Sequence, residues 1–260
     1  MITTMDQLVE ALATASPANS FDSTMPSKGS GYFQSLWQAS GNPGSGATPP
    51  TGAGAALTNA TPGAIPYTNP GAGLTGYLGR FFAVGTSIAT VMLYDRLVTT
   101  SGLSGVLTTA QTVNSAALTR YTSGAGVQAW LEFYGATGAT PTTASISYTN
   151  QAGTAGQIGS APISASLLVG TLIPITLAAG DTGVQSVQSV TLAASTGTAG
   201  NFGVTLGYVL AWAPVPRTAF ELQLDYADLG LPQIQNSACL ALADLGMASA
   251  SLHEFVFVQG

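Results

Sequence analysis

The most constraining feature of this sequence is a rhythm of short β-branched or aromatic runs that are separated by turn residues. The rhythm begins near residue 78, and its turns are rich in Gly, Ser, Thr and Asn, as in Ser123–Gly126 and Gly180–Gly183. The runs most typical of strands are Ile88–Leu97, Val127–Tyr134, Ala144–Thr149, Thr171–Leu177, Gly183–Leu192 and Gly203–Trp212. Several short strands with such punctuation predict a mainly β fold with a β-sandwich or jelly-roll core.

The pattern inside three runs predicts how each strand is buried. Ala144–Thr149 alternates between small or apolar and polar residues, so we expect one of its faces to be wet. Val127–Tyr134 is apolar enough to be buried on both faces. Val184, Val187 and Val190 recur every three residues, and their β-branching favours a strand that contains a bulge.

The two ends of the chain differ from this central part. Residues 4–15 predict a short helix, since Thr4 and Gln7 form a capping-box pattern ahead of a helical apolar spacing. Residues 224–230 predict a turn or short helical piece. Ile234, Ala238, Leu242 and Leu245 share a stripe that predicts a C-terminal helix ending at Gly246, and 252–258 predicts a final strand.

Residues 16–75 are dense in Gly, Pro, Ser, Asn and Thr, which is typical of an extended segment. We therefore divide the chain into residues 1–75, an N-terminal helix with a long extended arm, and residues 76–260, the β-sandwich domain with its C-terminal helix and strand. A flexible linker would leave its large apolar side chains exposed to water. The arm is therefore expected to lie on a surface, and its candidate interface residues are Tyr32, Phe33, Leu36, Trp37 and Tyr67.

Charge is scarce, with 5 Lys+Arg and 11 Asp+Glu in 260 residues. So few basic residues and a net charge of −6 argue against nucleic-acid binding. One His and one Cys exclude His-rich or Cys-rich metal sites and disulfide scaffolds. The charge-free runs 29–79, 133–180 and 182–216 are broken every few residues by Gly, Pro or polar residues, so a membrane span is not expected.

No group of residues predicts catalysis or a cofactor site. His253 and Glu254 are neighbours in an expected strand, so they point to opposite faces and cannot form a catalytic pair there. Asp225 and Asp228 are more typical of helix caps than of a hydrolase or calcium site. We expect Cys239 to be a small buried residue. The glycine-rich stretches lack the Lys-Ser/Thr ending of a phosphate-binding loop. We expect a protein that is not an enzyme and binds no metal or cofactor.

Small neutral residues suit extensive protein–protein contact, because burying them desolvates no charge and immobilises few rotamers. The sequence thus favours an assembly subunit with a β core and arms that reach neighbouring chains. The N-terminal residues 1–7 lack the basic and apolar regions of a secretion signal, so we expect the chain to stay in a cytoplasm until assembly.

Several motifs also resemble virion proteins of tailed bacteriophages. They span roughly residues 30–210 and are Leu36–Gly44, Pro66–Pro70, Leu93–Leu97, Ser147–Gln151 and Thr198–Thr205. The resemblance implies a head-associated virion component, with a capsid decoration or cement protein as the preferred role. It further implies β-sandwich or jelly-roll cores and trimers at capsid symmetry axes.

The partners implied are thus the major capsid protein and copies of the chain itself as a homotrimer, with no nucleic acid and no membrane. The expected location is the virion, assembled in the host cytoplasm. Two alternatives stay open at this point. One is another virion part, either a major capsid protein or a tail or fibre subunit. The other is a carbohydrate-binding β module whose exposed aromatics, Trp37 among them, would line a groove.

Overall fold

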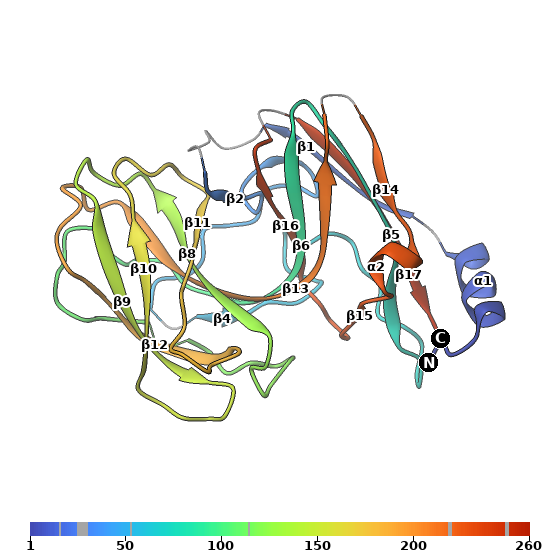
Figure 1. Cartoon of the computed structure of the whole chain (residues 1–260), viewed down its shortest axis with the longest axis horizontal. Helices are drawn as coiled ribbons and strands as arrows, with labels where there is room; N and C mark the ends of the chain where they lie inside the picture. The colour runs from blue at the N-terminus through green and yellow to red at the C-terminus, as the bar shows by residue number, and fades with distance from the viewer. Residues whose placement is uncertain (16, 25–30, 53, 114, 218–219, 248–249) are drawn as a thin grey trace.

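A computed structural model describes residues 1–15, 17–24, 31–52, 54–113, 115–217, 220–247 and 250–260, with the backbone alone for residues 19 and 21–24. The chain is mainly β, as predicted, and its named strands pair antiparallel in three sheets that follow one another across Figure 1. Its elements are α1 (Met5–Thr14), β1 (Pro17–Thr24), β2 (Phe33–Ser35), β3 (Ser40–Asn42), β4 (Ala55–Ala56), β5 (Gly76–Gly85), β6 (Ala89–Thr99), β7 (Gln111–Thr112), β8 (Val127–Gly135), β9 (Thr142–Asn150), β10 (Gln157–Ile163), β11 (Thr171–Pro174), β12 (Val184–Leu192), β13 (Asn201–Val215), β14 (Leu222–Leu224), α2 (Tyr226–Leu229), β15 (Gln233–Ile234), β16 (Leu240–Leu245) and β17 (Ser251–Gln259).

The middle sheet closes on itself as a barrel. Its strand order is β13–β8–β11–β2–β16–β6, and β6 pairs back with β13, so that six strands form a ring, while β4 adds to the edge of β6. Closure removes free edges within the ring, and alternate side chains of each strand point into the barrel or out of it.

A four-stranded sheet, in the order β10–β9–β12–β7, packs on one side of the barrel. The shared core contains Ile146 and Tyr148 of β9 together with Leu131 and Phe133 of β8, all buried. The alternation of β9 is confirmed, since its residues are buried and more exposed in turn. This arrangement of two facing sheets is the sandwich part of the fold.

The bulged strand predicted around three valines is β12. Its pairing with β9 shifts register between Val184 and Ser186, and again between Val187 and Ser189. Each shift adds one residue to the outer side, so Val184, Val187 and Val190 all stay in the core at 0–1% exposure. The period of three therefore comes from a strand bulged twice.

The third sheet, in the order β14–β5–β17–β1–β3 with β15 also paired to β5, packs on the opposite side of the barrel. Its core includes Phe81 of β5 and Phe255 of β17, packed against Leu93 of β6 and Leu240 of β16. The predicted N-terminal helix is confirmed as α1, with Thr4 and Gln7 in a capping box. It lies outside this sheet, at the far right of Figure 1.

The C-terminal helix predicted from residues 234–246 is wrong. The segment forms β15 and β16, and only the short piece near 224–230 is helical, as α2. β16 is a barrel strand with Leu240 and Leu242 packed outward and Ala241 and Ala243 packed inward. Because each face of the strand is covered, it has no polar alternation, and its apolar residues happened to match a helical spacing.

Residues 1–75, set apart in the sequence as helix and arm, share their strands with residues 76–260. β2 lies between β11 and β16 in the barrel wall, and β1 and β3 extend the outer sheet. Residues 16, 25–30 and 53 of the predicted arm lie outside the described residues. The rest of the arm is extended, as expected, and it lies against its own chain.

Candidate functional site

The barrel interior is a polar cluster surrounded by aromatic side chains. Arg96 of β6 contacts Glu132 and Tyr134 of β8 as well as Tyr94 of its own strand, and Trp130 packs against Tyr94 with ring centroids 5.6 Å apart. Gly207 of β13 leaves the space for these rings, because a Cβ there would lie 2.8 Å from Tyr94 and 2.9 Å from Trp130.

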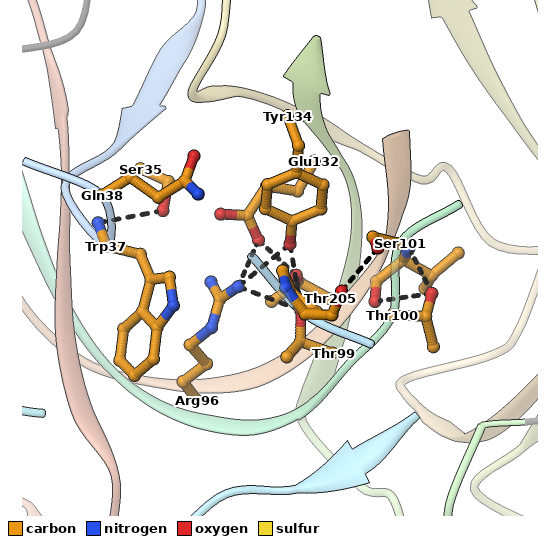
Figure 2. A network of polar contacts seen from close by, with 12 residues as sticks. Ser35, Trp37, Gln38, Arg96, Thr99, Thr100, Ser101, Glu132, Tyr134 and Thr205 are labelled. Carbon is orange, nitrogen blue, oxygen red and sulfur yellow. Dashed lines mark hydrogen bonds and ion pairs between the residues drawn. The ribbon is translucent and has the colours of Figure 1, made fainter. Parts of the chain in front are cut away.

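Arg96 and Glu132 form an ion pair at the centre of this cluster (Figure 2). The Arg96 Nη2 atom lies 2.7 Å from Glu132 Oε2, and the side chains are 0% and 2% exposed. Arg96 also donates to Tyr94 and Tyr134 at 3.1 Å and to Thr99 at 3.0 Å, while the Thr205 hydroxyl donates to Glu132. The cluster therefore ties β6, β8 and β13 together by charge-assisted hydrogen bonds.

The electrostatics keep this pair ionised. Burial by itself would raise the pKa of Glu132, but the charge and hydrogen bonds of Arg96 lower it below its ordinary value. Burial likewise opposes the charged form of Arg96, and the Glu132 carboxylate raises the Arg96 pKa above its ordinary value. A fixed, sealed ion pair of this kind can set strand register, but it has no accessible group to offer to a substrate.

Trp37 closes the cluster on one side. The Arg96 guanidinium carbon lies 4.8 Å from the Trp37 ring centroid, a cation–π distance, and the indole Nε1 donates to the Ala47 carbonyl at 3.0 Å. In Figure 2 Trp37 and Ser35 lie together to the left of the ion pair, and the Trp37 backbone N–H donates to the Ser35 hydroxyl. Thus the extended segment after β2 supplies a lid for the barrel interior.

A second buried ion pair fixes the loop that precedes β8. Arg120 donates from Nε and Nη2 to the two carboxylate oxygens of Asp95, each at 2.8 Å, and from Nη1 to the Leu57 carbonyl at 2.9 Å. The Cys239 backbone N–H also donates to Asp95 at 2.9 Å. The Asp95–Arg120 pair therefore joins four distant segments inside the protein.

The structure places the five candidate interface residues mainly inside their own chain. Leu36, Trp37 and Tyr67 are buried at 6%, 4% and 6% exposure, and Tyr67 packs edge-on against Phe257. Phe33 is half-buried and packs edge-on against Trp212. Tyr32 is also half-buried and is hydrogen-bonded to Ser164. Since Leu36, Trp37 and Tyr67 are already covered, they present no surface to a partner or sugar in this fold.

The other chemistry-bearing residues are also structural in their contacts. His253 is fully buried, and burial lowers its pKa from 6.5 to about 3. Burial raises the pKa of the Cys239 thiol to about 12, which keeps it protonated. Asp225 and Asp228 form the capping box of α2, as their position before a helix predicted.

Among the described ranges, three or more His, Cys, Asp or Glu side chains nowhere gather closely enough to hold a metal ion. In the same part of the chain, no helix has the length and apolar character needed to cross a membrane.

The outer face of the four-stranded sheet presents neutral side chains. The cross-strand register aligns its outward side chains in rows, Ser160–Ser145–Thr191, Ile158–Ser147–Ser189 and Pro162–Thr143. We call these eight residues the neutral face. They are exposed or half-buried, and five of them line a hollow of about 310 Å³, namely Thr143, Ser145, Ile158, Ser160 and Thr191.

Charge is divided unequally between the two ends of the molecule. Between residues 97 and 216 the sequence has only Arg120, Glu132 and Asp181, and the first two are buried in the ion pairs. Asp181 is held by Tyr148 at 2.5 Å and Asn150 at 2.7 Å. The described side chains that carry charge at the surface otherwise lie in the outer sheet, at its helices and in the loop between β13 and β14, at Asp6, Glu10, Arg80, Arg217, Glu221, Asp225, Asp228 and Glu254.

The charge-free runs 133–180 and 182–216 indicate this division in the sequence, but the two ion pairs are not predicted there. A signal for the pairs was present, because Asp95, Arg96 and Glu132 each stand inside an apolar run that predicts a buried strand. Charged residues in such runs are almost never buried without a partner.

Comparison with known proteins adds little to this picture. No family model matches the chain, and no curated protein matches it. Among solved structures, one described as "Structure of infectious bursal disease virus Gt strain" is similar at 12% identity, over 95% of this chain and 82% of that chain, with a TM-score of 0.21. At that TM-score the similarity carries no argument, so the function has to be inferred from the chain itself.

Proposed function

We propose that this chain is a non-enzymatic structural protein of a tailed-phage virion, which binds and stabilises the capsid shell as a decoration or cement protein. The observation that carries the proposal is the neutral face, a broad sheet surface without a charged side chain. The sequence resemblance to tailed-phage virion proteins supports it independently. The proposed partners are the major capsid protein and further copies of the chain, and the proposed location is the virion.

The physical reason lies in what charged side chains do on a sheet surface. Charges on strands normally suppress association between sheets, because burying them costs several kcal/mol each. The neutral face lacks that protection, and its Ser and Thr side chains lose little rotamer entropy when they are covered. Such a face is therefore suited to being covered by a neighbouring subunit in the assembled particle.

A charge placed in the central row tests the proposal. Ser145→Lys puts an ammonium group between Ser160 and Thr191, where contact with a shell would have to desolvate it. Ala227→Lys on α2 adds the same charge to the exposed surface of the charged end and serves as the matched control. The measurement is co-sedimentation with empty capsids assembled from the major capsid protein of the same virus.

We expect Ser145→Lys to weaken capsid binding by at least about tenfold and Ala227→Lys to leave it unchanged. Normal capsid occupancy by a folded Ser145→Lys protein would refute the role of the neutral face. Deleting residues 1–75 is a poorer test, because it removes β2 from the barrel wall and Trp37 from the barrel interior.

A further inference from the structure

Three polar side chains form a buried row on the outer side of the barrel wall. Gln34 of β2 lies directly opposite Thr171 of β11 on one side and Asp244 of β16 on the other. Directly opposed residues of antiparallel strands point to the same face, so the three side chains are neighbours. The row points away from the barrel interior, because Ser35 and Leu172, the next residues along β2 and β11, face inward. The three residues are only 0–1% exposed.

The Gln34 amide contacts the Thr171 hydroxyl, with 3.1 Å between Nε2 and Oγ1. The hydroxyl donates in turn to the Leu168 carbonyl at 2.8 Å, so a lone pair of Oγ1 faces the amide. The amide oxygen Oε1 is buried and accepts no hydrogen bond from the residues that the structure describes. Buried polar side chains are normally satisfied at both ends, so a structural hydrogen bond alone explains Gln34 poorly.

A hydroxyl held against a carboxamide is a nucleophile placed beside an acyl group. Attack of Thr171 Oγ1 on Gln34 Cδ forms a C–O bond, and the C–N bond then breaks, so that the amide nitrogen leaves as ammonia with the hydroxyl proton. The product is an ester between the two side chains, and no oxidant or further reactant is consumed. Fixed proximity replaces a bimolecular encounter, and burial excludes the water that would hydrolyse the ester.

Asp244 places an ionisable group beside the same amide, on the side away from the hydroxyl. Its Oδ1 accepts a hydrogen bond from the Met247 N–H at 3.0 Å, which holds the carboxyl group in place. A carboxyl group beside a leaving nitrogen can deliver the proton that the nitrogen needs to depart. The row therefore contains a nucleophile, an acyl group and a proton carrier on three adjacent strands.

We infer that Thr171 and Gln34 are the site of an internal ester cross-link, which the folded chain forms by itself with release of ammonia. The bond joins β2 to β11 across the barrel wall, between residues that are 137 positions apart in the sequence. It fastens the segment 1–75 covalently to the strands that follow. The inference goes beyond the proposed capsid-binding role, because the row lies in the barrel wall and not on the neutral face.

Intact mass spectrometry of the full-length chain tests the inference directly. We expect the folded wild-type protein to be lighter than its sequence by one ammonia molecule. Trypsin cuts after Lys and Arg, so the digest should contain residues 29–80 joined to residues 121–217, the peptides that hold Gln34 and Thr171. A folded protein with its full sequence mass overturns the inference, and so does a loss of ammonia without this joined peptide.

Two substitutions at one position separate the ester from the hydrogen bond. Thr171→Val removes the nucleophile and keeps the shape, so it should abolish the ammonia loss, whereas Thr171→Ser keeps the hydroxyl and should retain it. The valine variant should also melt at least about 5 °C below the serine variant, because the covalent loop is open. The same ammonia loss in both variants would contradict the inference. A valine variant that still binds capsids would leave the proposed function standing.

The part played by Asp244 has its own readout. Asp244→Asn should lower the cross-linked fraction at a fixed time after synthesis by at least about tenfold, because proton delivery is lost. An unchanged cross-linked fraction in the folded variant would refute this role.

Discussion

Acidification is expected to destabilise the protein through His253, the only histidine of the chain. Its imidazole is fully buried in β17, with its ring centroid 6.4 Å from that of Phe81, and burial lowers its pKa from 6.5 to about 3. At a pH between these two pKa values, the imidazole is protonated in the unfolded chain but stays neutral in the folded chain. The stability contributed by neutral His253 is therefore complete above about pH 6.5 and is lost as the pH falls toward 3.

The magnitude follows from the same two pKa values. The free energy of unfolding should fall by about 1.4 kcal/mol per pH unit once the pH is well below 6.5. Integrated from about pH 7.5 to about pH 5, the loss is about 2 kcal/mol. Carboxylates contribute mainly below this window, because their ordinary pKa values are near 4.

Urea unfolding at the two pH values measures the loss, with His253→Leu as the matched variant. The variant keeps every carboxylate of the chain, so the difference between the two pH dependences isolates the imidazole. We expect the wild-type midpoint to fall on acidification and the leucine variant to change by less than a quarter as much. If the free energy of unfolding depended on pH equally in the two proteins, the conclusion that burial keeps His253 neutral would be refuted.

Three further substitutions test the barrel interior and the sandwich core. Glu132→Gln leaves the Arg96 charge buried without its partner and should lower the free energy of unfolding by about 3–5 kcal/mol in urea titrations. The double variant Arg96→Met with Glu132→Leu removes both charges and should recover most of this loss. Gly46→Ala puts a Cβ 2.2 Å from the Trp37 ring and should cost about 1–3 kcal/mol in thermal unfolding, while Gly44→Ala, with nothing within 4 Å, should be neutral. Tyr148→Phe removes the hydrogen bond donated to Asp181 at 2.5 Å and the one accepted from the Ala178 N–H at 2.8 Å. It should lower the free energy of unfolding by about 1–3 kcal/mol. An unchanged melting temperature would show that water replaces the hydroxyl.

Local sequence patterns predicted two kinds of element. One is a helix that begins with a capping-box pair of residues, and the other is a strand that has one apolar and one polar face. The capping box at Thr4 and Gln7 located α1, and the valines of β12 located a bulged strand. In each case one physical requirement dominates, a satisfied helix end or an apolar inner face, and it leaves a periodic trace in the sequence.

The errors occur where long-range closure decides the structure. Ala241 and Ala243 point into the barrel while Leu240 and Leu242 point outward, so no alternation separates a strand from a helix there. Trp37 looked like an anchor on a loop-like arm, yet it covers a guanidinium supplied by Arg96. The pairing of Arg96 with Glu132 depends on strand register across the barrel, which spacing along the chain does not encode.

One strand connects the three parts of the molecule mechanically. β13 is 15 residues long, and it carries Val204 and Leu206 in the sandwich core and Ala213 and Val215 in the outer-sheet core. It is hydrogen-bonded to β8 along its first half and to β6 from Thr205 to Val215. A pull between the neutral face and the outer sheet would therefore load these ladders in shear, with many hydrogen bonds sharing the force at once. β13 thus passes from one core to the other as a single strand, so force applied to either end of the molecule is transmitted through the barrel wall.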